Sequence, residues 1–408
     1  MSDLDLVIFV APFYRANNME FVEAVDRLPG VRTALISSDP WDRFPRQITE
    51  RVHFWQVPDA TNADHLTHAA FELGQRHGRA HRILAISEAI QVQVAEVRER
   101  LGIPGMSSRV IRKFRDKGVM KEAFRAAGVP CARHCSAHSW DEAHEFISQV
   151  GFPVCVKPVD GAAAQATFKV DNLQTLDQIL TASAPTFDRP LQIEEFVVGE
   201  EGSLETFSVD GNHLWQSLTH YTPTPLNVVS NPWIQWQVLC PREVDDPRYD
   251  DLKAAGRKAL DALGMSSGLT HLEWFRRPDQ SLAISEIAAR PPGAEITTMI
   301  NRCHDVDSAS IWAQVMIRGH LPEIPGRKYA SGAAFLRGMG GGRVRAVHGL
   351  EVLDQLDCDV CDAKIPKPGD PAATTYEGEG YVLVRHPETE KVRRALATIV
   401  DKVRVELV

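Results

Sequence analysis

The sequence of 408 residues predicts a mixed architecture, in which an α/β domain precedes two α+β lobes and a C-terminal extension. Strand-like and helix-like segments alternate through residues 1–112, as in a small parallel sheet. From residue 113 the short strand-like segments are joined as hairpins rather than by helical crossovers, which is typical of α+β units. Beyond residue 326 a glycine-rich turn lies between further short strands. The predicted divisions are 1–112, 113–198, 199–325 and 326–408.

Apolar periodicity predicts the elements of the first two divisions. In the first, strands are expected at 5–10, 31–37 and 82–87, and helices at 19–28, 65–76 and 88–101. No GxGxxG motif follows the first strand, so a dinucleotide site is not supported. In the second, helices are expected at 113–127, 139–150 and 173–180, and strands at 152–158, 168–170 and 191–198.

The last two divisions are predicted in the same way. In the third, strands are expected at 203–209, 213–219, 271–276 and 282–287, with helices at 249–263 and 307–317. Residues 221–241 show no clear period and are expected to form a long loop. The extension should contain strands at 333–337, 343–347 and 381–385 and a closing helix at 390–403.

Composition and charge exclude several classes of protein. With 44% hydrophobic and 24% charged residues, the chain is typical of globular proteins. A net charge of −9 argues against a nucleic-acid or membrane-surface partner. We find neither a signal peptide nor an apolar run near the ~20 residues of a membrane span. The seven cysteines fit a reducing compartment and lack the paired spacing of a zinc site, so a cytoplasmic protein is expected.

The most informative segment is the predicted hairpin around residues 271–287. If its loop comprises residues 278–281, an antiparallel register sets Glu273 directly opposite Glu286. Facing carboxylates repel unless a cation lies between them, and Mg²⁺ binds one or two carboxylates together with water and phosphate oxygens. Arg290 has the parity of Glu286 and is expected on the same face. The alternative is a solvated face, because a one-residue slip would separate the two glutamates.

Two lysines and a loop of small residues precede the hairpin. Lys117 lies on a basic helix, and Lys157 ends an otherwise apolar strand. Lysine is rarely fully buried without a partner, so Lys157 is a candidate for a phosphate contact. The loop at 160–167, which includes Gly161 and Ala162, would let backbone amides approach phosphates. A surface lysine is the alternative for Lys117.

An acidic strand end follows. Glu194 and Glu195 precede Phe196 and Val197, and Glu201 comes after a glycine at 199. The strand's backbone could pair with the edge of an adenine, and a carboxylate could accept hydrogen bonds from ribose hydroxyls. Acidic strand ends are common, so this signal is weak alone.

In this order the motifs resemble the ATP-grasp superfamily over about residues 1–320. The resemblance implies an ATP-grasp fold in which two α+β lobes clamp ATP, with an N-terminal parallel-sheet domain. It implies that Lys117 and Lys157 contact phosphates, and that the loop with Gly161 and Ala162 closes over them. It further implies roles for adenine binding (Glu194, Glu195, Phe196, Val197), ribose binding (Glu201), Mg²⁺ binding (Glu273, Glu286) and substrate binding (Arg290, Gly293, His220, Trp233).

The resemblance also implies the chemistry. An ATP-grasp ligase forms a C–N bond between a carboxylate and an amine through an acyl phosphate, releasing ADP and phosphate. Arg290 and Lys157 would be catalytic, and ATP with two Mg²⁺ ions, or Mn²⁺ in their place, would be the cofactors. Ala288 stands where many members carry an asparagine, so one metal ligand is missing from the expected set.

The extension after residue 326 looks like that of the L-amino acid ligases, so the expected function is dipeptide synthesis from amino acids. A homodimer is the expected assembly. Two alternatives stay open at this point: a purine-pathway type of ATP-grasp ligase acting on a phosphorylated substrate, and a nucleotide-binding regulatory protein without catalysis.

Overall fold

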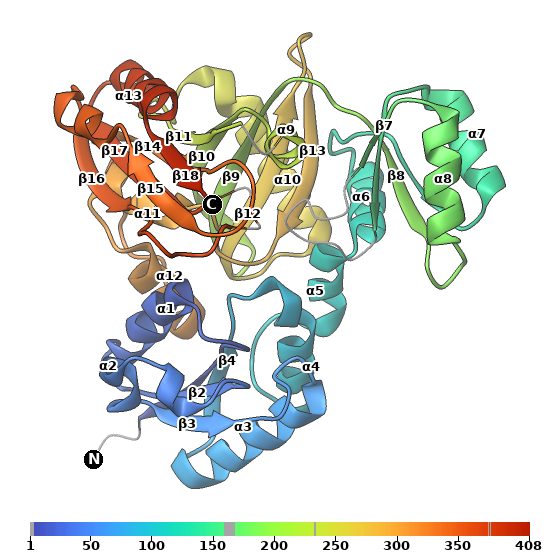
Figure 1. Ribbon diagram of the computed structural model, residues 1–408. Coiled ribbons are helices and arrows are strands. Elements are labelled where there is room, and N and C mark those ends of the chain that lie inside the picture. Colours follow the sequence, from blue (N-terminus) through green and yellow to red (C-terminus); the bar gives the residue numbers. More distant parts are fainter. Residues whose placement is uncertain (1–3, 159–167, 232–233, 374, 376) are drawn as a thin grey trace.

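The computed structural model describes residues 4–158, 168–231, 234–373, 375 and 377–408, without the side chains of Lys157 and Pro158. Figure 1 shows an N-terminal domain below a large sheet, and a small lobe that projects from the side of that sheet. Across the described residues, no helix is both long and apolar enough to cross a membrane.

The N-terminal domain contains a four-stranded parallel sheet in the order β3-β2-β1-β4. The parallel sheet and its alternating helices are therefore confirmed. Helices α3 and α4 cover one face, and α1 covers the other together with α12 from far along the chain. The elements are β1 (Asp5–Val10), α1 (Ala16–Asp26), β2 (Val31–Ser37), η1 (Trp41–Arg43), α2 (Arg46–Thr49), β3 (His53–Gln56), α3 (Ala63–His77), β4 (Ala80–Leu84), η2 (Glu88–Ile90) and α4 (Gln91–Leu101).

Two helices, α5 (Ser108–Arg115) and α6 (Lys117–Ala127), connect this domain to the next. The predicted single helix at 113–127 is therefore wrong. Asp116 has extended backbone angles, and its side chain accepts a hydrogen bond from the Val119 amide, 3.0 Å away. It thus ends one helix and caps the next, which places Lys117 at the first position of α6.

The small lobe is an antiparallel sheet in the order β5-β8-β6-β7, with two helices packed on it. The predicted strand at 191–198 ends at Glu195, and residues 196–199 form a linker without regular secondary structure. The elements are β5 (His134–Ala137), α7 (Trp140–Val150), β6 (Val154–Pro158), β7 (Phe168–Val170), α8 (Leu173–Ser183) and β8 (Leu191–Glu195).

The largest unit is an eight-stranded antiparallel sheet in the order β13-β12-β9-β10-β11-β14-β17-β16. Strands from both of the last two predicted divisions belong to it, so this sheet continues past residue 326. Its strands are β9 (Glu200–Val209), β10 (Asn212–Thr222), β11 (Trp236–Cys240), β12 (Gly268–Arg276), β13 (Leu282–Ala288), β14 (Ala330–Leu336), β16 (Asp359–Lys364) and β17 (Gly380–His386).

The expectation of a long loop at 221–241 is wrong. This stretch contains a helix and the inner strand β11, which is paired with β10 and β14. The helices around the sheet are α9 (Pro225–Ser230), η3 (Pro247–Tyr249), α10 (Asp250–Leu263), α11 (Ile296–His304), α12 (Ser308–Arg318), η4 (Leu350–Gln355) and α13 (Thr389–Lys402).

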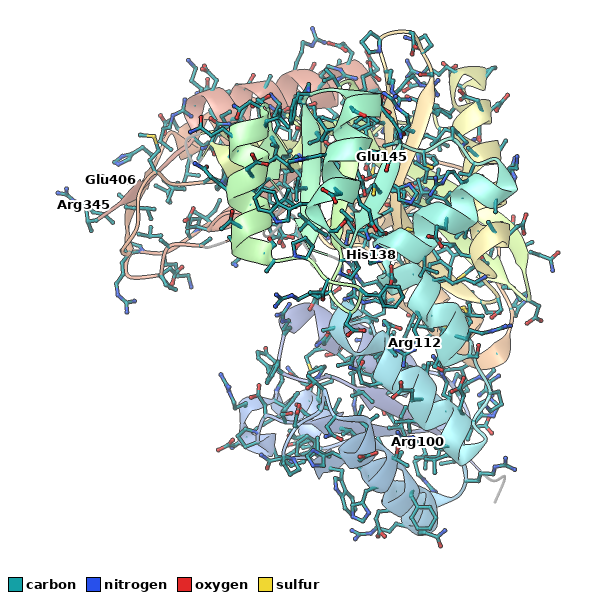
Figure 2. The ribbon with its side chains drawn as sticks, turned by 90° about the vertical axis from the view of Figure 1, so that its right-hand side faces the viewer. Arg100, Arg112, His138, Glu145, Arg345 and Glu406 are labelled. Atoms are coloured by element: carbon teal, nitrogen blue, oxygen red, sulfur yellow. The ribbon has the colours of Figure 1, made fainter. Side chains whose placement is uncertain are left out.

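A small two-stranded sheet, β15 (Val344–His348) with β18 (Arg404–Leu407), closes the chain. At its edge Arg345 and Glu406 form an ion pair of 3.1 Å, and Figure 2 shows both side chains at the periphery. Arg100 and Arg112, also labelled in Figure 2, are paired with carboxylates as well. These surface cations therefore do not form a single-sign basic patch.

Candidate active site

The hairpin of β12 and β13 sets Glu273 directly opposite Glu286, which confirms the predicted pairing of these two residues. Two features of the hairpin differ from the prediction, although the pairing of the two glutamates is the same. The loop includes Arg277 and is one residue longer than predicted, and Ser285 has no partner opposite because a bulge interrupts the ladder there. The longer loop and the extra residue Ser285 each shift the register by one residue, in opposite directions, so Glu273 still faces Glu286. After the bulge Ile287 packs in the core, while Glu286 and Ala288 line a cavity.

That cavity has a volume of about 770 Å³ and lies where the small lobe, the large sheet and the N-terminal domain meet. Most of the predicted site residues that the structure describes line it. They are Lys117, Glu194, Glu195, Phe196, Val197, Glu201, Glu273, Glu286, Arg290 and Gly293.

Each of the facing carboxylates has a nitrogen group nearby. Lys117 Nζ lies 3.3 Å from Glu286 Oε2, and His271 Nε2 lies 3.9 Å from Glu273 Oε1. Both glutamate side chains are about one-third exposed, at 29% and 32%. The carboxylates are thus anchored by the sheet but open toward the cavity.

The linker after β8 forms another wall of the cavity. Glu194 and Glu201 are buried, whereas Glu195 is held by Arg133 at 3.1 Å. Burial alone would raise the pKa of Glu195, but hydrogen bonds from Arg133 outweigh it and lower the pKa. Gly199 allows the linker to pass close to the hairpin, because a methyl group there would overlap the Arg276 carbonyl. The predicted adenine-binding segment is therefore a constrained part of this wall.

Lys121 is a cavity residue that sequence reasoning missed. Its side chain is 1% exposed, its Nζ lies 3.5 Å from Glu194 Oε2, and it donates a hydrogen bond of 3.3 Å to the Ile284 carbonyl. Lys121 is four residues after Lys117, and this spacing puts both on one face of α6. That spacing was the available signal.

Arg290 is oriented by a second residue that was missed. Its Nε and Nη2 both donate to Glu88 Oε2, at 3.0 and 2.7 Å, and Arg115 pairs with the other oxygen of Glu88. Glu88 belongs to the N-terminal domain, more than 200 positions before Arg290. No sequence pattern indicated this contact.

The other predicted substrate residues lie elsewhere. His220 does not line the cavity: its Nε2 lies 2.9 Å from the Tyr249 hydroxyl and its ring packs edge-on against Trp274. The neighbouring Tyr221 lines the cavity instead, because successive side chains of a strand point to opposite faces. Trp233, Gly161 and Ala162 lie outside the described residues, as does the side chain of Lys157.

Glu377 brings the C-terminal segment into the cavity. One of its oxygens accepts a hydrogen bond of 3.2 Å from the Ala294 amide, next to Gly293. Burial raises the pKa of Glu377, although that hydrogen bond and nearby Lys364 oppose the change. This end of the cavity therefore carries an acidic group of reduced acidity.

The donor set fits a magnesium–nucleotide complex. Glu273 and Glu286 supply hard oxygen ligands on one face, which suits an ion that keeps water and phosphate oxygens in its remaining positions. Over the described ranges, no cluster of three or more His, Cys, Asp or Glu side chains has the geometry of a metal site. The pair therefore suits a metal that arrives with phosphate oxygens better than a closed protein site.

Comparison with known proteins identifies the domain. Residues 122–304 match the model of the ATP-grasp domain. Alanine–anticapsin ligase of Bacillus subtilis (strain 168) is 23% identical over 269 residues, which are 60% of this chain and 56% of the relative. L-arginine-specific L-amino acid ligase of Bacillus subtilis is 24% identical, over 64% of this chain and 62% of the relative. The chain thus spans little more than half the length of these curated relatives.

Solved structures share the fold across the whole chain. An L-amino acid ligase from Bacillus licheniformis superposes with a TM-score of 0.78 at 15% identity, covering 100% of both chains. N5-carboxyaminoimidazole ribonucleotide synthetase from Thermotoga maritima has a TM-score of 0.74 at 15% identity, over 99% of this chain and 100% of the other. With the matched domain, these likenesses show that the chain carries an ATP-grasp domain and adopts the ATP-grasp fold.

Proposed function

We propose that the protein is an ATP-dependent carboxylate–amine ligase that joins amino acids and releases ADP and phosphate. The observation that carries the proposal is the facing pair Glu273 and Glu286, in one cavity with Lys117 and Arg290. Two magnesium ions bound there would neutralise charge on the phosphate chain of ATP. Relatives named as amino acid ligases support the choice of substrates.

Different side chains of the cavity would bind different parts of ATP and of the substrate. The wall formed by Glu194 to Val197 and Glu201 would hold the nucleoside, and Lys117 and Lys157 its phosphates. Arg290, fixed by Glu88, would orient the substrate carboxylate for attack on the γ-phosphate. The γ-phosphoryl group would pass to that carboxylate as ADP leaves, which gives the acyl phosphate. The amine would then attack the acyl carbon and lose a proton, and phosphate would leave. Catalysis of this kind depends on positioning and electrostatics, so no covalent enzyme nucleophile is needed.

The test is a turnover assay with pairs of amino acids. ADP and phosphate should appear only when a carboxylate and an amine substrate are both present, and release of AMP would contradict the proposal. Glu286→Gln should keep the fold and lose most turnover, at least about 100-fold, because a carboxylate facing the phosphates is removed. Glu323→Gln, on the segment between α12 and β14 and outside the cavity lining, is the control and should be fully active.

The same assay decides between this function and a purine-pathway type of ligase. That alternative is favoured by the likeness to N5-carboxyaminoimidazole ribonucleotide synthetases. The lining argues against it, because ATP and the substrate carboxylate would occupy Lys117 and Arg290, and Lys121 is buried against Glu194. Among the described lysines and arginines of the lining, Arg15 alone is then left for a ribose phosphate. Activity with 5-aminoimidazole ribonucleotide and none with amino acids would establish the alternative. ATP binding without turnover on any pair would indicate a regulatory protein.

A further inference from the structure

A buried carboxylate and an imidazole lie directly behind the proposed metal ligands. His271 and Glu273 are two residues apart on β12, so their side chains share one face of the sheet. His271 Nδ1 lies 2.9 Å from Glu205 Oε1, and its Nε2 lies 3.9 Å from Glu273 Oε1. The imidazole is therefore hydrogen-bonded to a carboxylate inside the sheet and lies beside a carboxylate at the cavity.

The burial of Glu205 is unusual for its residue type. It is 0% exposed in the middle of the large sheet, and its second oxygen has no hydrogen-bond partner among the described residues. Burying a carboxylate is costly, and apolar side chains of similar size usually serve a sheet core better. The Nδ1–H of His271 is the contact that compensates it, and this contact also fixes the plane of the imidazole ring.

The position across the hairpin from His271 is occupied by a methyl group. The register pairs His271 with Ala288, just as it pairs Glu273 with Glu286. Ala288 lines the cavity on the same face as Glu286 but offers no polar atom. The pair of His271 and Ala288 thus lies next to the pair of facing carboxylates. Only its member on β12, His271, has a side chain that can form a hydrogen bond.

We propose that Glu205 and His271 are positioning residues for the metal site, in which the ring fixed by Glu205 lies beside the Glu273 carboxylate and restricts its movement from the β12 side. The proposal rests on the proposed function in one respect, since it takes Glu273 to be a ligand of the metal. Residues that orient metal ligands typically change metal affinity 10- to 100-fold when they are removed.

The proposal is tested by metal binding rather than by turnover. Mn²⁺ serves as the probe, and its free concentration is followed by electron paramagnetic resonance with the full-length protein and a non-hydrolysable ATP analogue. His271→Ala should weaken Mn²⁺ binding about 10-fold or more. Glu205→Gln should weaken it less, because the amide oxygen still accepts a hydrogen bond from Nδ1. Should His271→Ala fail to fold, His271→Phe replaces it, since phenylalanine keeps the ring without its nitrogen atoms.

A matched control makes the test specific. His213→Ala removes another imidazole that contacts a carboxylate, Asp261 at 3.2 Å. His213 lies outside the cavity lining, so this variant should bind Mn²⁺ as the parent does.

The outcomes separate this inference from the proposed function. Unchanged Mn²⁺ binding in His271→Ala, or in His271→Phe, would overturn the inference and leave the ligase proposal standing. Equal losses in His271→Ala and the His213→Ala control would also overturn it. If the parent protein itself binds no Mn²⁺ with the ATP analogue, the metal site fails and both proposals fall.

Discussion

At the scale of single residues, the ion pair of Lys121 and Glu194 links the cavity to the stability of the fold. Both side chains are almost fully buried, at 1% and 5% exposure. Lys121 also reaches the backbone of β13 through Ile284, so one ammonium group joins α6, the linker strand β8 and the hairpin. Such a pair is costly to form, but it is far more costly to break from one side only.

Lys121→Met should lower the free energy of unfolding by about 3–5 kcal/mol, because it removes a buried ammonium group that faces Glu194 and donates to the Ile284 carbonyl. Denaturant titration measures the change. Adding Glu194→Gln to this variant should recover much of the loss, since it also removes the buried charge that Lys121 faces.

The exposed Lys258 on α10, which donates to the Gly128 carbonyl, provides the matched control. Lys258→Ala should change the free energy of unfolding by no more than about 0.5 kcal/mol. Equal effects at both lysines would contradict a special role for the buried pair.

At the scale of elements, the bulge at Ser285 decides which face Glu286 occupies. Before it, Leu282 and Ile284 belong to the core; after it, Ile287 does. The alternation of β13 is therefore reset by one residue, and Glu286 and Ala288 turn to the cavity. If Ser285 instead took a regular place in the ladder, Glu286 would fall on the core face.

Deletion of Ser285 should leave Mn²⁺ binding with an ATP analogue within a few-fold of the parent, because Glu286 then follows Ile284 directly and still lies opposite Glu273, now in a regular ladder. Circular dichroism should show that the protein still folds. Deletion of Ala283 is the contrast, since it removes one residue from the same strand but turns Ile284 out of the core, and it should lower the stability markedly. Loss of metal binding in a folded Ser285 deletion would show that the carboxylate needs the bulge itself.

Local patterns in the sequence predicted the elements whose signals are local. The strands β1 and β2 are confirmed, since apolar runs specify them. The pairing of Glu273 with Glu286 is confirmed as well, but only because the longer loop and the bulge offset each other. The break at Asp116 was missed because a single aspartate in a basic helical stretch does not reveal whether it caps a new helix. Strand β11 was missed because its pairing with β10 and β14 depends on partners distant in the sequence.

At the scale of the whole molecule, the cavity is assembled from segments that are far apart in the chain. Glu88 comes from the N-terminal domain, Lys121 from the connecting helices and Glu377 from the C-terminal segment. The N-terminal domain is held against the large sheet by α12, whose Trp312 lies in a shared core, and by Arg82, which donates to the Met316 carbonyl at 3.0 Å. Such contacts follow from tertiary packing, so sequence patterns could not reveal them.

The free energy of unfolding of the whole protein should depend on pH through two buried histidines, His134 and His220. Burial lowers the pKa of His134 to about 4, and the nearby charges of Arg125 and Lys121 act in the same direction. Burial likewise lowers the pKa of His220 to about 4, assisted by Arg248. Both rings are therefore neutral in the folded protein near pH 7, whereas in the unfolded chain they bind protons near pH 6.5.

The unfolded state consequently binds more protons between about pH 6.5 and 4, and the folded protein should lose stability as the pH falls through this window. Each histidine contributes a slope of at most about 1.4 kcal/mol per pH unit, and the contribution is fully present above about pH 6.5. Denaturant titrations at several pH values should show that His134→Gln and His220→Gln each reduce the slope. Because carboxylates titrate in the lower part of the window, the comparison with the parent between pH 6.5 and 5 is decisive. An unchanged slope in both variants would mean that folding does not lower the pKa of either ring.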